Sequence, residues 1–424
     1  MIAFALIHQN DEPMRSFFFT TLSIICMAAA LGLFTGCGED ASKESNVVRI
    51  GFAGVMTGPE GGDLGTDCFN GARLAVEEWN AKGGVLGKKI EVVERDDEGK
   101  PAQAVAVAND LCAQGIVVLF GHINSGCTIP ASPIYDEHGI VQMTLSSNPE
   151  VTERGLGTLF RCYSRDDQEG RFAAEFAYQS LTLRKMAVMH NKTAYGQGVA
   201  EEFKKRFEEL GGEVVLFTGI GSEELDFRAN ITSIQTAGAD GLFFGGLYSQ
   251  SGPLINQLRQ AGVAIPFLSG NGSFHPSLAT VAGADVQNLY VIFGPDYKKM
   301  PSAQPFLKKY HDRFGPEKGF SIYGYDAVNI LLTAIEKAGK DGDEKVKGSV
   351  PDSRKIIDTL RTTRFETCIG PIEFDNKGDL KQGNFVIWTV KKGEFTPYVL
   401  ETEIEHGCKE RSDPPAPLPT PKNS

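Results

Sequence analysis

Val47-Val-Arg-Ile-Gly-Phe-Ala53 opens the stretch that decides the fold, residues 47–95. It is an apolar run of strand length, and Lys89-Ile-Glu-Val-Val-Glu-Arg95 has the residue types of a second strand. Between them, the segment from Gly71 places apolar residues at i, i+3, i+4 and i+7, and Gly83-Gly84 follows. This spacing predicts a helix with one apolar face that ends at the two glycines. A strand, a helix and a strand in this order form a β-α-β unit, which predicts a parallel sheet.

The composition restricts the class of protein. The chain has 424 residues, of which 41% are hydrophobic and 23% are charged, and its formal net charge is −12. These values are typical of a soluble globular protein of about two domains. The acidic balance argues against a nucleic-acid partner. The sequence has no Gly-x-Ser-x-Gly, His-Glu-x-x-His, Walker or Cys-x-x-Cys motif, so we expect no enzyme activity, no cofactor and no metal site.

An export signal is expected ahead of the first strand. Residues 17–34 are apolar, follow Arg15 and lead into Thr35-Gly36-Cys37. A short apolar segment closed by small residues indicates a cleaved signal peptide rather than a membrane span. The last three residues resemble a lipobox, which implies that Cys37 is acylated and becomes the new N-terminus. An ordinary signal peptide cut nearby is the alternative.

The ends of the chain are assigned from the same pattern. We expect a signal peptide over residues 1–36, with Met14 as an alternative start because residues 1–13 lack basic residues. A polar, lipidated tether would occupy residues 37–46. The Pro-rich residues 409–424 are expected to be a disordered tail, because their composition cannot bury a core.

Strands and helices alternate through the rest of the chain. Further strands are expected at residues 116–120, 140–145, 185–190, 213–218, 241–244 and 265–269. Further helices are expected at residues 102–114, after 125, and at 199–210, 227–237, 253–261, 302–314, 323–339 and 352–361. This alternation predicts an α/β protein with two doubly wound lobes.

Several motifs along the chain resemble those of the leucine/isoleucine/valine-binding protein family. They include Met56-Thr-Gly-Pro59, Phe69-Asn-Gly-Ala-Arg-Leu-Ala75, Asn80-Ala-Lys-Gly-Gly-Val-Leu-Gly87, Tyr195-Gly-Gln-Gly198, Gly324-Tyr-Asp-Ala327 and Gly370-Pro-Ile-Glu-Phe-Asp375. The resemblance implies the type I periplasmic-binding-protein fold, in which a three-segment hinge joins the two lobes. It also implies that the chain is the substrate-binding component of an ABC importer for branched-chain amino acids or related ligands.

The resemblance further implies where the chain crosses between the lobes. The crossings are expected near residues 164–168, 293–296 and 374–375. The N-terminal lobe would then comprise residues 47–165 and 295–374, and the C-terminal lobe would comprise residues 166–294 and 375–408. The disulfide that many relatives carry is absent, because its two positions are Gly99 and Asn124 here. A Cys368–Cys408 bond is an alternative.

The ligand is expected beyond the carboxyl ends of the strands, where helix N-termini present unpaired N–H groups. Gly121-His-Ile-Asn-Ser125 and Ser146-Ser-Asn-Pro149 follow two strands of the first lobe. By resemblance, the hydroxyls of Ser125 and Ser147 and the backbone around Ser146 would hold a ligand carboxylate. The alternative role for Ser125 is that of an ordinary helix N-cap.

Other residues are assigned mainly by their place relative to the family pattern. Tyr195 would be the aromatic clamp of the second lobe. Leu64, in the loop after Pro59, would line a side-chain pocket or simply pack within the loop. Asp166 and Asp167 lie at the first crossing, where a carboxylate would pair with a ligand ammonium or remain a solvated charge of the hinge.

The sequence departs from the family at the position that usually pairs with the ligand ammonium. Asn271 stands where the family has an acid. At a second position, Leu247 stands where the family has a tyrosine, and Tyr248 is next to it. Because asparagine carries no charge, the pattern leaves open whether the ligand is an α-amino acid or a carboxylic acid or amide without the ammonium.

These observations predict a monomeric, extracytoplasmic, lipid-anchored protein, periplasmic where an outer membrane is present. It would capture a small carboxylated ligand and deliver it to an ABC permease. A receptor that senses the same ligand and signals to a membrane kinase or chemoreceptor is the alternative. Genes for a permease and an ATPase beside this one would favour transport, and a histidine kinase gene would favour sensing.

Overall fold

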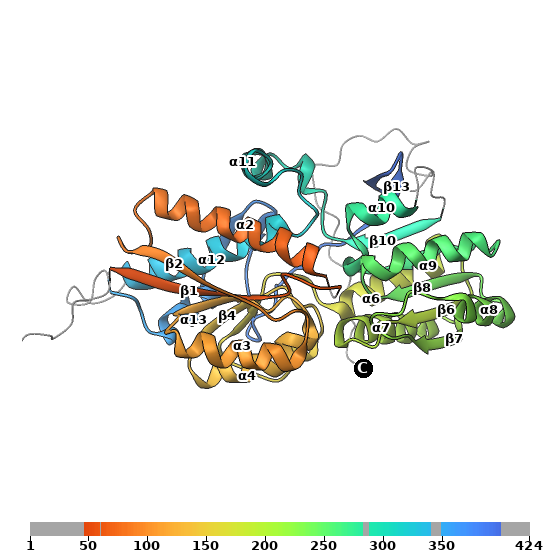
Figure 1. The fold of residues 1–424 in the computed structure, drawn as a ribbon, viewed down its shortest axis with the longest axis horizontal. Coiled ribbons are helices and arrows are strands. Elements are labelled where there is room, and N and C mark those ends of the chain that lie inside the picture. Colours follow the sequence, from red (N-terminus) through yellow and green to blue (C-terminus); the bar gives the residue numbers. More distant parts are fainter. Residues whose placement is uncertain (1–45, 60, 283–287, 341–348, 400–424) are drawn as a thin grey trace, which may run out of the picture. The chain divides into compact units, whose positions relative to one another are not determined.

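The computed structural model describes residues 46–59, 61–282, 288–340 and 349–399. Two large sheets organise this part of the chain (Figure 1). We call the part around the five-stranded sheet the first lobe and the part around the seven-stranded sheet the second lobe. The expected signal peptide, residues 37–45 of the expected lipidated tether, Cys408 and the Pro-rich tail lie outside the described residues. No helix within these ranges is long and apolar enough to cross a membrane.

The first lobe contains a fully parallel sheet with the strand order β2-β1-β3-β4-β5. Its strands are β1 (Val47–Gly54), β2 (Lys89–Asp96), β3 (Val118–Gly121), β4 (Val141–Thr144) and β5 (Leu159–Arg161). Its helices are α2 (Gly62–Ala81), α3 (Pro101–Ala113), α4 (Ser125–Glu137), α5 (Glu150–Glu153), α11 (Gln304–Phe314), α12 (Ser321–Lys340) and α13 (Ser353–Thr362). A small hairpin of β11 (Phe365–Thr367) and β12 (Gly370–Ile372) follows α13.

The second lobe contains a sheet with the order β14-β13-β10-β9-β8-β6-β7, in which the pairs of β13 with β10 and β14 are antiparallel. Its strands are β6 (Lys185–His190), β7 (Glu213–Gly219), β8 (Gly241–Gly245), β9 (Phe267–Ser269), β10 (Leu289–Phe293), β13 (Val386–Lys391) and β14 (Glu394–Pro397). Its helices are α6 (Asp166–Glu175), α7 (Ala194–Glu209), α8 (Arg228–Ala237), α9 (Tyr248–Gln260) and α10 (Pro276–Ala282). A single π-helical turn, Phe176–Ser180, extends α6.

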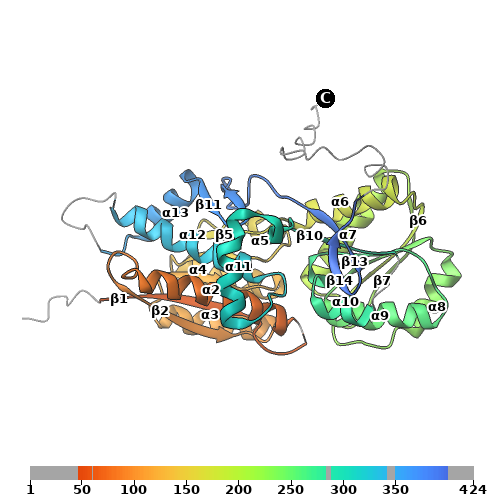
Figure 2. The same cartoon turned by 90° about the horizontal axis from the view of Figure 1, so that it is seen from above.

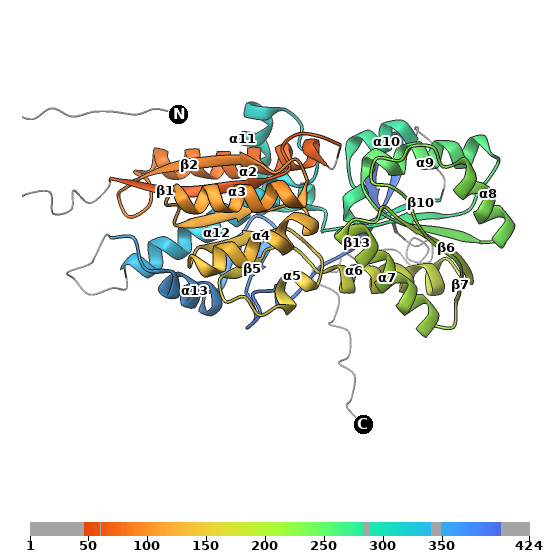
Figure 3. The same cartoon turned by 60° about the horizontal axis from the view of Figure 1, so that its bottom comes forward.

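Helices cover both faces of each sheet, as a doubly wound fold requires. In the first lobe α2 packs against α12, and α3 pairs with α4 on the opposite face (Figure 1). In the second lobe α6 and α7 lie on one face, and α8, α9 and α10 lie on the other (Figures 2 and 3). The expectation of two doubly wound α/β lobes is therefore confirmed.

Glycine allows α2 and α12 to approach backbone to backbone. A Cβ atom on Gly71 of α2 would lie 1.8 Å from the carbonyl oxygen of Ser321. A Cβ atom on Gly324 of α12 would lie 2.1 Å from the carbonyl oxygen of Cys68. No side chain fits at either position, because real non-bonded contacts are far longer than these distances.

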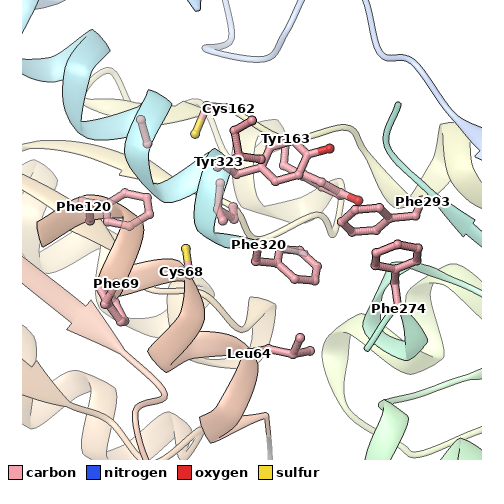
Figure 4. Packing of buried hydrophobic residues seen from close by; sticks show 14 of the residues in the cluster. Leu64, Cys68, Phe69, Phe120, Cys162, Tyr163, Phe274, Phe293, Phe320 and Tyr323 are labelled. Carbon is pink, nitrogen blue, oxygen red and sulfur yellow. The ribbon is translucent and has the colours of Figure 1, made fainter. Parts of the chain in front are cut away.

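An aromatic cluster lies where the chain connects the two lobes (Figure 4). Tyr163 follows β5, Phe293 ends β10, and Phe320 precedes α12. The rings of Phe274 and Phe293 stack with centroids 3.9 Å apart, and the ring of Phe320 lies 5.2 Å from that of Phe293. Tyr163 lies 5.8 Å from Phe320. Two of the three connecting segments thus share one packed cluster.

Three details of the structure differ from the expected fold or add to it. Helix α2 begins at Gly62 rather than near Gly71, so Leu64 lies in a helix and not in a loop. Helix α6 begins at Asp166, so the first crossing leads directly into a helix. Near the third crossing, the backbone N–H of Arg161 donates to the carbonyl oxygen of Gly378 at 2.8 Å. The chain therefore still contacts strand β5 of the first lobe a few residues after the expected crossing at residues 374–375. The boundaries of the lobes remain a prediction.

None of the described cysteines forms a disulfide bond. They are Cys68, Cys112, Cys127, Cys162 and Cys368. The Cys368–Cys408 alternative involves a residue outside the described ranges, so it remains a prediction.

Candidate functional site

A cavity of about 610 Å³ lies at the carboxyl ends of strands from both sheets. Its wall in the first lobe includes Val55, Leu64, Ile123, Ser125, Leu145 and Ser147, and its wall in the second lobe includes Tyr195, Leu247, Asn271 and Gly272. This is the place where open α/β sheets bind ligands. The volume lies in the range of small-molecule sites, about 300–1,000 Å³.

Two serines of the first lobe can hold an anion. Ser125 follows β3 and Ser147 follows β4, and these strands are neighbours in the sheet. The structure places the N-cap of α4 at Asn124, so Ser125 is the first helical residue rather than the cap. Its buried Oγ accepts a hydrogen bond from the backbone N–H of Asn148 at 3.2 Å, which leaves the hydroxyl proton for a ligand. The positive end of the α4 dipole also favours an anion there.

Ser146 does not line the cavity, and its side chain makes hydrogen bonds within the protein next to the two serines. Its Oγ donates to the carbonyl oxygen of Ile123 at 2.9 Å and lies 2.5 Å from the Oγ1 of Thr128. Its backbone N–H donates to the Oγ1 of Thr144 at 3.0 Å. Because both polar groups of Ser146 are used within the protein, the predicted contact of Ser146 with the ligand is not supported.

Arg161 fixes the turn that carries Ser147. Its buried guanidinium donates to the carbonyl oxygens of Ser146 at 3.0 Å and Asn148 at 2.8 Å. The same guanidinium donates to Oδ1 of Asp379 at 2.6 Å and 2.8 Å. Although burial alone would raise it, the guanidinium groups of Arg161 and Arg165 hold the pKa of Asp379 below its usual value. This buried ion pair therefore fixes the position of the turn that carries Ser147.

Tyr195, Leu247 and Asn271 follow β6, β8 and β9, which are consecutive in the second sheet. The buried hydroxyl oxygen of Tyr195 accepts a hydrogen bond from the backbone N–H of Gly272 at 2.9 Å. Tyr248 points elsewhere, since its ring stacks on that of His275 with centroids 4.0 Å apart. Tyr248 is therefore absent from the described cavity wall, contrary to the prediction.

The two aspartates at the first crossing occupy different environments. The carboxylate of Asp167 pairs with the guanidinium of Arg165 at 2.9 Å and is partly exposed. Asp166 is fully buried, and neither of its carboxylate oxygens has a hydrogen-bond partner of normal geometry among the described residues. Neither side chain belongs to the cavity wall. Asp166 is nevertheless close to it, because its backbone N–H donates to the carbonyl oxygen of cavity-lining Ser147 at 2.8 Å.

Glu169, a fully buried acid on α6, was not predicted from the sequence. Its Oε1 accepts a hydrogen bond from the backbone N–H of Asn271 at 2.6 Å, and its Oε2 accepts one from the Asn271 side chain at 2.5 Å. An acid therefore lies directly against the position where the family's acid is replaced by asparagine. Its spacing from Asp166, three residues along one helix, is the signal that could have identified it.

Six of the predicted site residues share the cavity. They are Leu64, Ser125, Ser147, Tyr195, Leu247 and Asn271. Cavity-lining residues that the sequence analysis did not name include Ile123, Lys192, Thr193, Glu223 and Phe320. Among the described residues, no group of three or more His, Cys, Asp or Glu side chains could hold a metal ion.

Comparison with known proteins places this geometry in a family. The sequence profile of the periplasmic binding protein family matches residues 47–394. An amino acid binding protein of Pseudomonas aeruginosa is 37% identical over 369 residues, which cover 86% of this chain and 94% of that protein. The Leu/Ile/Val-binding protein homolog 1 of Brucella suis is 35% identical over 352 residues, which cover 83% and 92%.

A solved structure gives the same result for the fold. The leucine-binding protein LivK of Thermotoga maritima has a TM-score of 0.75 and 28% sequence identity, and the match covers 83% of this chain and 98% of that one. These relatives are binding proteins, which confirms the interpretation of this chain as a binding protein rather than an enzyme. The resemblance noted in the sequence is confirmed as well, and the chain belongs to the periplasmic binding protein family, with the type I fold.

Proposed function

We propose that this protein captures a branched-chain amino acid, or a closely related carboxylic acid, outside the cytoplasm and delivers it to an ABC permease. One observation carries the proposal. A single cavity is lined by residues of both lobes, with two serine hydroxyls at one end and an apolar wall beside them. The relatives named above bind amino acids, which supports the same ligand class here.

The apolar wall suits a branched aliphatic side chain. It is formed by Val55, Leu64, Ile123, Leu145, Leu247 and Phe320. Burial of a leucine or isoleucine side chain contributes roughly 1.5–3 kcal/mol. The serine pair would bind the ligand carboxylate, and the aliphatic side chain would then occupy the apolar part of the cavity.

Contacts between the lobes surround the cavity and support a closing mechanism. The side-chain amide of Asn148 donates to the carbonyl oxygen of Ala194 at 2.7 Å. The hydroxyl of Ser249 donates to the carbonyl oxygen of Pro59 at 3.3 Å. A ligand that touches both lobes would stabilise this closed arrangement over an open one, because it gains its full set of contacts only there. The permease would then bind the closed form.

Titration of the purified protein with leucine, isoleucine and valine tests this proposal. Binding to the folded state should raise the melting temperature, because a ligand at one hundred times its Kd stabilises a protein by about 2.7 kcal/mol. Calorimetry should give one ligand per protein. The proposal fails if neither these amino acids nor branched aliphatic acids change the melting temperature at millimolar concentration.

Anchoring through Cys37 is the second part of the proposal, and fractionation of cells tests it. The wild-type protein should partition with membranes, because a diacylated N-terminus adds two apolar chains, which suffice for stable anchoring. Cys37→Ser should remain unprocessed or appear as a soluble form. A wild-type protein that is wholly soluble, with its mature N-terminus elsewhere, would contradict the lipoprotein assignment.

A further inference from the structure

We propose that Asp166 and Glu169 form an acidic subsite that holds one shared proton in the empty protein and exchanges it for the ammonium group of the ligand. This inference rests on the proposed function, because it concerns the same cavity. It assigns the counter-charge of the ligand to helix α6 rather than to the strand end that carries Asn271.

The first observation concerns the buried carboxylate of Asp166. Its side chain is fully buried, and neither carboxylate oxygen makes a hydrogen bond of normal geometry within the described ranges, although the Ser147 hydroxyl lies close enough to lower the pKa of Asp166. A buried carboxylate without well-formed hydrogen bonds is strongly disfavoured in its charged form. Such a group calls for a partner that arrives from outside the protein.

The second observation is that Glu169 lies on the same face of α6. Residues three positions apart on a helix are neighbours, and Glu169 is also fully buried. Burial raises the pKa of both carboxyl groups, and in each case the negative charge of a neighbouring carboxylate raises it further. Two carboxylates this close together in a buried place do not both ionise readily, so the empty pair retains a proton.

The third observation is that the pair lies directly behind the cavity wall. Glu169 accepts hydrogen bonds from Asn271, which lines the cavity, and Asp166 is joined through its backbone to Ser147, which also lines it. The buried hydroxyl of Tyr163 beside the pair likewise has no hydrogen-bond partner among the described residues. An ammonium group has three donors and one positive charge, which matches this set of acceptors.

The charged and titratable neighbours do not already neutralise the pair. Burial raises the pKa of Asp166, the hydroxyl of Ser147 and the guanidinium groups of Arg161 and Arg165 lower it in part, and the carboxylate of Asp167 raises it. Both arginines make hydrogen bonds to Asp379, and Arg165 also bonds to Asp167. Glu169 itself faces Asp166, Asn271 and the hydroxyls of Tyr163 and Tyr195. The cation that completes the subsite therefore comes from the ligand.

The exchange gives opposite pH dependences for two ligands of nearly the same shape. Leucine adds a positive charge beside the pair, so the pair ionises fully and its proton passes to the buffer. Leucine binding should weaken as the pH falls through the pKa of the empty pair, by up to about tenfold per pH unit for one released proton. 4-Methylpentanoate lacks the amino group and brings only a negative charge, so its binding should hold or strengthen over the same range.

Calorimetry of the full-length protein at pH 6, 7 and 8, in two buffers with different ionisation enthalpies, measures the number of protons released. We expect close to one proton per leucine below the pKa of the pair and none for 4-methylpentanoate. Glu169→Gln should abolish the release and weaken leucine binding at least tenfold at pH 8, while 4-methylpentanoate binding is retained. Glu175→Gln is the matched control on the same helix, because Glu175 pairs with Arg206 at 2.6 Å on the outside, and it should behave as wild type.

The outcomes separate this inference from the proposed function. Leucine binding without proton release, with the same pH dependence as 4-methylpentanoate, would overturn the inference and leave the proposed function intact. If neither ligand binds, and no other branched-chain amino acid does, the proposed function fails. The proton count on the wild-type protein decides the matter even if the Glu169→Gln variant does not fold.

Discussion

Replacement of Asp379 by alanine is expected to lower the free energy of unfolding by about 3–5 kcal/mol, the usual cost of removing one partner from a buried ion pair. Asp379 is 3% exposed and accepts two hydrogen bonds from Arg161, which is 0% exposed. Without Asp379 the guanidinium of Arg161 would remain buried without its carboxylate. Urea unfolding followed by circular dichroism measures the change.

Lys377→Ala is the matched control for this prediction. Lys377 lies two residues away and pairs with Glu153 at 2.6 Å, but both side chains are largely exposed. Loss of an exposed pair should cost less than about 1 kcal/mol. If the two variants lose similar amounts of stability, the ion pair of Arg161 and Asp379 does not stabilise the turn that carries Ser147.

Ser125→Ala is expected to weaken ligand binding by about ten- to a hundredfold. A hydrogen bond to a charged group contributes roughly 1.5–3 kcal/mol, and each 1.4 kcal/mol changes an affinity about tenfold. The hydroxyl of Ser125 lines the cavity beside Ser147, where the ligand carboxylate is proposed to bind. Calorimetric titration with the best ligand from the amino acid screen provides the dissociation constant.

Ser132→Ala separates binding from stability. Ser132 lies on the same helix and is equally buried, but its hydroxyl donates to the carbonyl oxygen of Thr128, away from the cavity. This variant should have a lower melting temperature and an unchanged dissociation constant. If Ser125→Ala behaves in the same way, Ser125 serves only to join its helix to the Asn148 turn, and the carboxylate site is assigned wrongly.

The fold could be predicted where periodicity extends over long segments. The strand at Val47, the helix before Gly83 and the helix after Ser321 carry clear apolar patterns, and all three were expected. Short or irregular elements were missed because tertiary contacts decide them. Strand β5 has only three residues, and helix α6 begins with the charged Asp166-Asp-Gln-Glu169, which resembles an exposed turn until its buried face is known.

Only those site residues that come soon after the end of a strand could be predicted from the sequence. Ser125 and Ser147 directly follow strands, so their convergence follows from the parallel sheet. The role of Ser146 could not be predicted, because side chains in an irregular turn do not point inward and outward with a fixed period. The contact of Glu169 with Asn271 joins residues that lie 102 positions apart. No local sequence pattern predicts such a contact. The sequence therefore shows that Asn271 replaces an acid, but it does not show that the carboxylate of Glu169 lies beside Asn271.

The close contact between α2 and α12 also constrains the order in which the protein can fold. Helix α2 lies near the beginning of the described chain and α12 near its end, with strands β6 to β10 of the second lobe between them. All five strands of the first sheet are therefore synthesised long before α12, which packs with α2 on one of its faces. Contacts between distant segments slow folding, and apolar surface left open meanwhile favours aggregation. A nascent chain that ends after β10 contains the whole first sheet together with α2, α3 and α4 but lacks α12, so the first lobe is completed only when synthesis is nearly finished.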